Sequence, residues 1–211
     1  MTVTRDDLLA VISESPDDHD AWLLYADWLQ QRGEVRGELI ALDIALETAT
    51  AERKVELEAA RVELVASYGA ALLGETFAKF IASGYGAVTW HRGFISMFTY
   101  AGTHLMAHKR VVGWLVRLIL DNPEPFTFLR RLELPWTDFS DLAPFVQFKH
   151  LAILDVAHTN VVDIAPLAGM GKLSRVNLTA CQIPAAALRA YKTAHPEVSV
   201  TEPGGFFTPD A

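Results

Sequence analysis

A repeat with a period of 22 residues occupies the C-terminal half of the chain and restricts its fold more than any other feature. Written from Leu129, three rows read LRRLELPWTDFSDLAPFVQFKH, LAILDVAHTNVVDIAPLAGMGK and LSRVNLTACQIPAAALRAYKTA, and HPEVSVTE begins a fourth. The apolar columns are Leu129, Leu151 and Leu173; Leu132, Leu154, Val176 and Val198; and Leu134, Val156, Leu178 and Val200. The identical pairs are Thr137/Thr159, Asp141/Asp163, Ala143/Ala165 and Pro144/Pro166. Agreement at one period predicts stacked copies of one small structural unit.

Each row predicts a short strand followed by a capped turn. The alternating Leu-x-Leu pattern is typical of a strand with one buried face. Asp141 and Asp163 can cap the turn that follows, and Pro144 and Pro166 then suit its first positions. The third row lacks this turn, and residues 185–194 predict a true helix instead. We expect this row to be a terminal unit that ends the stack.

The pattern LxxLxLxx(N/T/C)x(I/V)xDIxPL, clearest from Leu151 to Leu167, resembles the leucine-rich-repeat family in its 22-residue, internalin-like type. The resemblance implies an α/β fold, a short solenoid whose stacked units bury a continuous core. One column departs from the family. Its usual asparagine is replaced by Thr137, Thr159 and Cys181, whose hydroxyl or thiol can reach neighbouring backbone groups more weakly than an amide.

The N-terminal half predicts a compact helical bundle. Thr4 and Asp7 have the spacing of a capping box and open a first helix that Pro16 ends. Asp17 or Asp18 can cap a second helix, which Gly33 closes. Its apolar face consists of Trp22, Tyr25, Ala26 and Leu29. A third helix is expected from residue 34 through residue 46. A fourth, over residues 51–68, is charged on one side and carries Val55, Val62 and Val65 on the other.

Three short motifs in this half resemble the bacterial repeat-companion domain, which accompanies leucine-rich repeats. They are Tyr25-Ala26-Asp27-Trp28-Leu29, Arg32-Gly33-Glu34 and Arg36-Gly37-Glu38, and the segment Trp90-His91-Arg92-Gly93-Phe94-Ile95 fits the family's usual lead into the repeats. The resemblance implies an architecture but no reaction. We therefore predict a helical N-terminal domain over residues 1–84 that caps a solenoid over residues 85–211. Between them, residues 88–99 predict a strand or hairpin arm, and residues 105–120 a helix.

Composition excludes several classes of function. A formal charge of −8 argues against nucleic acid and anionic lipid as partners, unless a local basic patch overrides it. The single cysteine, Cys181, excludes an intrachain disulfide and a multi-cysteine zinc site, and it fits a reducing compartment. The N-terminal residues carry acids where a signal peptide would be basic, and no apolar run is long enough to span a membrane. We expect a soluble cytoplasmic protein.

The residues between the repeated leucines should face the concave side of the solenoid, with Trp136 and His158 at its edge. Solenoids offer such surfaces to partners, and aromatic and arginine side chains carry much of the energy of interfaces. We predict a non-enzymatic interaction module or scaffold with no catalytic residue, metal or cofactor. The predicted partner-binding residues are Arg131, Glu133, Trp136, Ile153, Asp155, His158, Arg175 and Asn177. The alternative is that these residues bind no partner and form a solvated face that only keeps the solenoid soluble.

Other interpretations remain open. His104 and His108 have a metal-ligand spacing, with His91 as a third candidate, which would suit a metal-binding or regulatory subunit of an enzyme complex. The chain could instead be an assembly component that contacts partners through its helical domain. Neighbouring Glu133 and Asp155 could bind a basic peptide or perform acid–base chemistry, and we prefer the first.

Four further features have simpler explanations. The acids at 17, 18 and 20 suit a helix N-terminus better than a cation site, and Asp27, Arg32 and Arg36 suit a structural ion-pair network better than a catalytic one. Cys181 is expected to be a buried structural thiol. The tail residues Phe206-Phe207 could anchor a partner or fold back on the last repeat.

Overall fold

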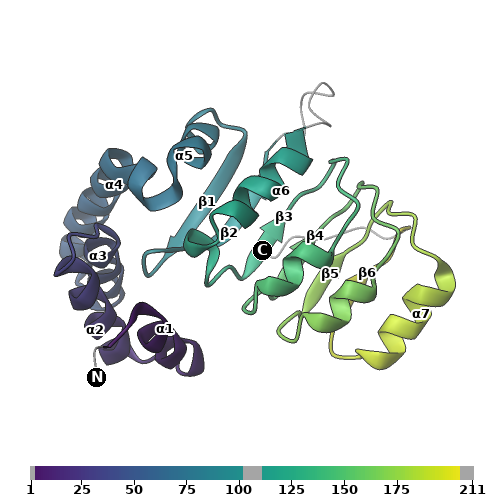
Figure 1. Ribbon diagram of the computed structural model, residues 1–211, viewed down its shortest axis with the longest axis horizontal. Helices are drawn as coiled ribbons and strands as arrows, with labels where there is room; N and C mark the ends of the chain where they lie inside the picture. Colours follow the sequence, from purple (N-terminus) through teal and green to yellow (C-terminus); the bar gives the residue numbers. More distant parts are fainter. Residues whose placement is uncertain (1–2, 102–110, 205–211) are drawn as a thin grey trace. The chain divides into compact units, whose positions relative to one another are not determined.

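The computed structural model describes residues 3–101 and 111–204. Within these ranges the protein is a mixed α/β structure with seven α-helices and a six-stranded, mostly parallel sheet (Figure 1). The chain divides into two compact units, one of residues 1–78 and 90–93 and the other of residues 79–89 and 94–211. The boundary predicted between residues 84 and 85 lies inside the second unit. The division at residue 78 lies inside helix α5 (Glu75–Ala82).

Helices α1 (Arg5–Glu14), α2 (His19–Gln30), α3 (Arg36–Thr48) and α4 (Ala51–Leu73) form the first unit. Thr4 caps α1 with both hydrogen bonds of a capping box, since the Asp7 amide donates to Thr4 Oγ1 and the Thr4 amide donates to Asp7 Oδ2. Asp18 Oδ1 caps α2 by accepting from the amides of Asp20 and Ala21. The predicted cap at Thr4 is confirmed, and of the two candidates for α2, Asp17 and Asp18, the structure selects Asp18.

Helix α2 contributes its predicted apolar face to the core. Trp22, Tyr25, Ala26 and Leu29 are all buried. Helix α3 packs closely on α2 at Gly37, where a Cβ atom would lie 2.5 Å from the carbonyl oxygen of Ala26. Two of the short motifs, the one that begins at Tyr25 and the one that begins at Arg36, therefore lie at the contact between α2 and α3.

The turn at residues 92 and 93 belongs to the helical unit although it connects two strands of the sheet. Arg92 has a φ of 48° and Gly93 a φ of 75°, as in the type I′ turn of a two-residue hairpin. The Gly93 amide donates to Asp43 Oδ2 at 3.0 Å, and the Arg36 guanidinium donates to the Gly93 carbonyl. Arg92 Nε and Nη2 each donate to Glu47 at 2.9 Å. Polar groups of α3 therefore fix the turn.

The sheet of the second unit has the order β1-β2-β3-β4-β5-β6. The short turn makes β1 (Gly86–His91) antiparallel to β2 (Phe94–Tyr100), and β2 to β6 are parallel. Strands β3 (Arg131–Glu133), β4 (Ile153–Asp155) and β5 (Arg175–Asn177) align Leu132, Leu154 and Val176, so the period of 22 residues is confirmed as a structural register. The side chains of these three residues are fully buried.

Helical segments return the chain from each strand to the next. They are α6 (Val111–Asp121), the 3₁₀ helices η3 (Glu124–Phe126), η4 (Ala143–Gln147) and η5 (Ala165–Gly169), and α7 (Ala185–Ala194). Figure 1 shows α6, η4, η5 and α7 succeeding one another beside the strands. The helix predicted over residues 185–194 is confirmed at both ends.

One predicted alignment is wrong. The last strand, β6 (Ser199–Thr201), pairs Val200 with Val176, whereas the sequence rows placed Val198 in that column. The third repeat is two residues longer than the others. Its strand is connected to the next one by the α-helix α7 of 10 residues, whereas the second repeat uses a 3₁₀ helix of five. An α-helix rises less per residue than a 3₁₀ helix, so it needs more residues to span a given distance.

The predicted capping contacts of the repeats are present. Asp141 Oδ1 and Asp163 Oδ1 each accept at 2.9 Å from the amide two residues later. Thr137 and Thr159 donate to the carbonyls of Leu134 and Val156, and Cys181 Sγ lies 3.1 Å from the Val156 carbonyl oxygen. The two hydroxyls and the thiol stand at equivalent positions of the sequence rows, and their contacts with backbone carbonyls agree with the prediction.

Candidate functional site

The strand residues predicted to bind a partner form two rows across one face of the sheet. The first row aligns Met97, Arg131, Ile153, Arg175 and Ser199, and the second aligns Thr99, Glu133, Asp155, Asn177 and Thr201. They alternate with buried residues such as Leu132, so the two rows lie on the opposite face of the sheet from the leucine core. The structure thus brings the six predicted strand residues together on one surface.

The β2–β3 end of this surface is tied by an ion pair. Arg131 Nε and Nη2 both lie 2.6 Å from Glu133 Oε1, and Thr99 Oγ1 donates to Glu133 Oε2 at 2.8 Å. The side chains of Arg131 and Glu133 remain 25% and 16% exposed. A partner can therefore contact this pair, but its charges already compensate each other.

Asp155 and Asn177 are engaged within the protein. Asp155 Oδ1 accepts from the Ala157 amide at 2.8 Å, and Asp155 Oδ2 accepts from Asn177 Nδ2 at 2.9 Å. Asn177 Oδ1 accepts from the amide and hydroxyl of Thr179. Burial raises the pKa of the Asp155 carboxyl, and the negative charge of Glu133 adds to this effect against the hydrogen bonds. Both side chains are also buried, with Asp155 8% and Asn177 3% exposed. Their role in partner binding stays a prediction.

Trp136 and His158 form a stacked aromatic pair just beyond β3 and β4. Their ring centroids lie 3.5 Å apart with planes 8° from parallel, and Trp136 is 55% exposed. Trp136, His158 and Ala180 occupy equivalent positions of successive repeats and have φ values of 61°, 57° and 57°. The left-handed conformation costs an L-residue about 1–2 kcal/mol. The sequence placed both aromatic residues at the edge of the surface but gave no signal of their backbone conformation.

Two arginines of the predicted ion-pair network, Arg32 and Arg36, make contacts with an aromatic ring and with carbonyl groups. The Arg32 guanidinium lies 3.6 Å from the Trp28 ring centroid, and Nη1 donates to the Trp28 carbonyl. Buried Arg36 donates to the carbonyls of Gly93 and, at 2.9 Å, Leu72. Both arginines therefore make structural contacts with a ring or with carbonyl groups, in keeping with a structural role for this motif.

Several candidates for chemistry lie elsewhere. His104, His108 and the Phe206-Phe207 pair lie outside the described residues. Cys181 is 4% exposed, as expected of a structural thiol. Across residues 3–101 and 111–204, no group of three or more His, Cys, Asp or Glu side chains has an arrangement that could hold a metal ion. No helix in those same ranges combines the length and apolarity needed to cross a membrane.

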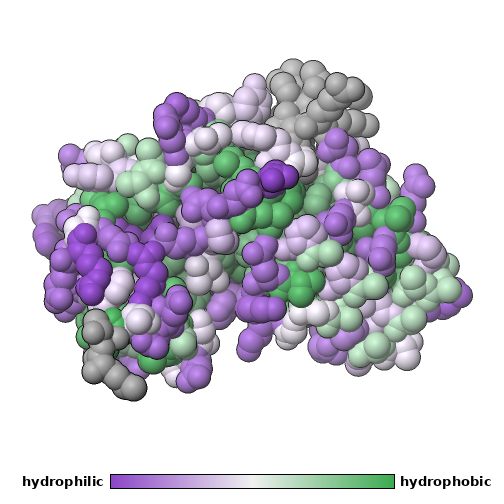
Figure 2. Space-filling model, in the orientation of Figure 1, coloured by the Kyte–Doolittle hydropathy of each residue, from purple (hydrophilic) through white to green (hydrophobic). Residues whose placement is uncertain are grey.

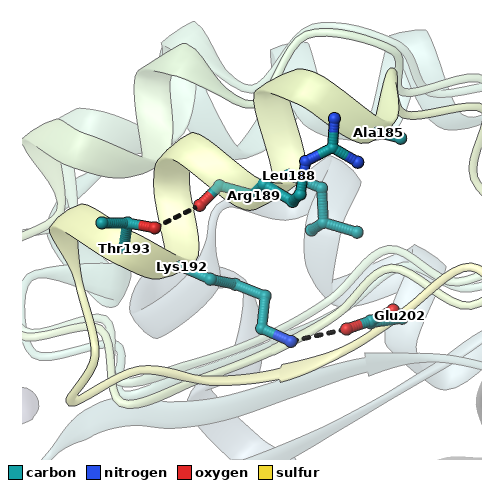
Figure 3. Close-up of a pocket in the computed structure, with 6 residues that line it drawn as sticks. All are labelled: Ala185, Leu188, Arg189, Lys192, Thr193 and Glu202. Carbon is teal, nitrogen blue, oxygen red and sulfur yellow. Dashed lines mark hydrogen bonds and ion pairs between the residues drawn. The ribbon is translucent and has the colours of Figure 1, made fainter.

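A hollow of about 510 Å³ lies at the last repeat (Figure 3). Its lining comes from α7 and from the residue that follows β6: Ala185, Leu188, Arg189, Lys192, Thr193 and Glu202. Lys192 Nζ bonds Glu202 Oε1 at 2.5 Å, and Thr193 Oγ1 donates to the Arg189 carbonyl. The hollow is therefore bordered by a salt bridge that joins α7 to the chain beyond β6, which suits the end of a stack.

A comparison of the sequence with protein-family models and with curated proteins found no match.

Proposed function

We propose that the chain is a leucine-rich-repeat protein of the 22-residue type, with a helical N-terminal cap, that binds a partner protein through the face of its sheet opposite the leucine core. The constant register of β3, β4 and β5 supports the solenoid architecture. The recurrence of an aspartate-capped 3₁₀ turn after β3 and β4 supports it as well. We assign the protein no catalytic step and, from its one buried cysteine, a reducing cytoplasmic environment.

The stacked pair of Trp136 and His158 is the observation that carries this proposal. Both residues lie in the left-handed turn that recurs at Ala180, so the backbone of this turn holds their rings in place. More than half of the Trp136 surface faces solvent, although burying an indole is strongly favourable. Tryptophan is also among the residues that most often dominate the free energy of protein interfaces. The pair therefore offers a preorganised aromatic contact beside the polar rows of the sheet.

Affinity capture from a lysate of the source organism tests this role. Trp136→Ala/His158→Ala should lose the partner that the wild-type chain retains. Asp155 is left unchanged because it holds Ala157 and Asn177. The lost stack contributes about 0.5–1.5 kcal/mol, so Tm should fall by no more than a few degrees.

Leu24→Ala/Tyr68→Ala is the matched control, since both side chains are at least half exposed and lie in the helical unit. This control should keep the partner. Loss of the partner from the control alone would assign the contact to the helical unit. Retention of the partner by both variants would reject the aromatic pair as its binding site.

A further inference from the structure

The aromatic stack beside the sheet ends after two units. Trp136, His158 and Ala180 occupy equivalent turns, with φ values of 61°, 57° and 57° and the same amide hydrogen bond to the following unit. The first two positions carry rings whose centroids lie 3.5 Å apart, whereas the third carries only a methyl group. The column of rings therefore stops at His158, although the backbone that supports it continues for one more unit.

His158 directs one face of its imidazole toward this third position. Its ring lies 8° from parallel with the ring of Trp136 in the preceding unit, so its opposite face is turned toward the unit of Ala180. Across residues 3–101 and 111–204, Trp136 is the only ring that stacks on His158. Neighbouring strands lie about 4.8 Å apart. A ring placed at the level of the next unit would therefore lie within stacking distance of the imidazole.

Small residues leave this position open to solvent. Ala180 is exposed, and so is Gly204, which directly follows the residue that accepts the Ala180 amide hydrogen bond. A Cβ atom at Gly204 would meet no atom within 4 Å. We call the space beside His158 and over Ala180 the His158 shelf.

The ring that borders the shelf distinguishes it from other exposed apolar surface. Figure 2 shows hydrophobic surface reaching solvent between hydrophilic side chains on the visible face of the protein, so exposure alone does not mark a binding site. At the His158 shelf, a stack of two rings already defines the plane and the spacing that a third ring would adopt. This geometry favours a planar group over other apolar groups.

We propose that the His158 shelf binds an aromatic side chain of the partner protein, which becomes the third ring of the stack. The proposal rests on the proposed function and adds the chemistry of the contact. Stacking gives an aromatic ring an advantage of about two- to tenfold in affinity over an aliphatic group of equal size.

Two other kinds of ring compete for the shelf. A nucleobase would also stack, but its phosphates would meet a chain with a net charge of −8. Phe206 and Phe207 follow closely in the sequence, but turning them back would order Gly204 and Gly205. Glycine loses more conformational freedom on ordering than any other residue. A side chain of a partner protein carries neither of these costs.

Disulfide exchange at Ala180→Cys measures what the shelf prefers. The full chain with this change is equilibrated with phenylethyl thiol or cyclohexylethyl thiol against excess mercaptoethanol, and mass spectrometry reads the bound fraction. The phenyl thiol should be captured about two- to tenfold more strongly. Both thiols have the same number of carbon atoms, and the cyclohexyl group is the more apolar, so burial alone would reverse this order.

Three controls belong to this experiment. Adding His158→Ala to Ala180→Cys removes the ring on which stacking depends and should abolish the preference for the phenyl thiol. Ala190→Cys makes the same substitution at an exposed position of α7 and should show no such preference. Cys181 is 4% exposed, and the wild-type chain reports any reaction of its thiol.

Equal or weaker capture of the phenyl thiol at Ala180→Cys overturns the proposal, as does a preference that survives His158→Ala. A preference that appears only after Phe206→Ala/Phe207→Ala is added overturns it in favour of the chain's own tail.

Affinity capture separates the shelf from the proposed function. Ala180→His would fill the shelf with an imidazole of the chain itself and should lose the partner. If this variant keeps a partner that Trp136→Ala/His158→Ala loses, the shelf is rejected and the proposed function stands. The preference between the two thiols is measured without any partner, so it tests the shelf whatever the capture finds.

Discussion

At the scale of single residues, the left-handed backbone at positions 136, 158 and 180 is the most regular feature of the repeats. Each of these residues donates its amide to a carbonyl of the following unit, at 2.8–2.9 Å: Ala157, Thr179 and Pro203 are the acceptors. The same hydrogen bond recurs whether the side chain is an indole, an imidazole or a methyl group. The left-handed conformation therefore follows from the hydrogen bonding of the turn and does not depend on the side chain.

Ala180→Gly should stabilise the protein by a few tenths to about 1 kcal/mol. Glycine relieves the left-handed strain of about 1–2 kcal/mol but adds about 0.5–1 kcal/mol of backbone entropy lost on folding. The measurement is the free energy of unfolding in urea.

Ala190→Gly provides the comparison, because Ala190 is exposed within helix α7 at an ordinary helical position. It should destabilise by about 1 kcal/mol. Equal losses for both variants would contradict the strain assigned to position 180.

At the scale of helices, the contact between α2 and α3 depends on the absence of a side chain at Gly37. A Cβ atom there would lie 2.5 Å from the Ala26 carbonyl oxygen and 3.0 Å from the Gln30 amide nitrogen. Both are backbone atoms, so neither can turn aside as a side chain would. The two helices would have to separate, exposing the interface that Tyr25 and Leu29 fill.

Gly37→Ala should therefore cost about 1–3 kcal/mol, the usual range for overpacking. Gly69→Ala in α4 should instead stabilise by about 0.5–1 kcal/mol, because its Cβ would meet no atom within 4 Å and alanine favours the helix. Thermal unfolding of the two variants checks both signs. A stabilising Gly37→Ala would show that the helices have room to adjust.

In helix α4, the pattern of apolar residues predicted the wrong buried face. The sequence grouped Val55, Val62 and Val65 as the apolar side of a bundle helix, but Val55 and Val62 are exposed and Leu57 is buried. The helix carries two apolar stripes, and local periodicity cannot decide which one meets α3. That choice depends on the surface that α3 presents.

At the scale of the whole molecule, a continuous apolar column joins the repeats through the second unit. Leu132, Leu154 and Val176 are paired in register and completely buried. Leu154 pairs with Leu132 on one side and with Val176 on the other. A central position therefore supports both neighbours at once.

Leu154→Ala should destabilise the protein by about 2–5 kcal/mol through lost burial and the cavity it leaves. Val162→Ala, at a side chain that is 51% exposed, should change stability by less than about 0.5 kcal/mol. Urea unfolding followed by circular dichroism measures both. A cost below 1 kcal/mol for Leu154→Ala would mean that the column does not hold the units together.

The sequence by itself determined what depends on neighbours along the chain or on an exact repeat. The caps of α1 and α2 involve residues only two or three positions away, so the sequence identified Thr4 and narrowed the second cap to Asp17 or Asp18. The register of β3 to β5 follows from the period, because identical units stack with identical hydrogen bonds. The position of the predicted partner-binding residues on one strand face follows from the same alternation.

Only the tertiary structure decided what depends on residues far apart in the sequence. It determined which face of α4 is buried and shifted the register of β6 by two residues. It also brought Asp155 into a hydrogen bond with Asn177, and Gly93 into hydrogen bonds with Asp43 and Arg36. It also set the left-handed backbone that stacks Trp136 on His158. Each outcome requires a partner brought close by folding, and local pattern carries no information about that partner.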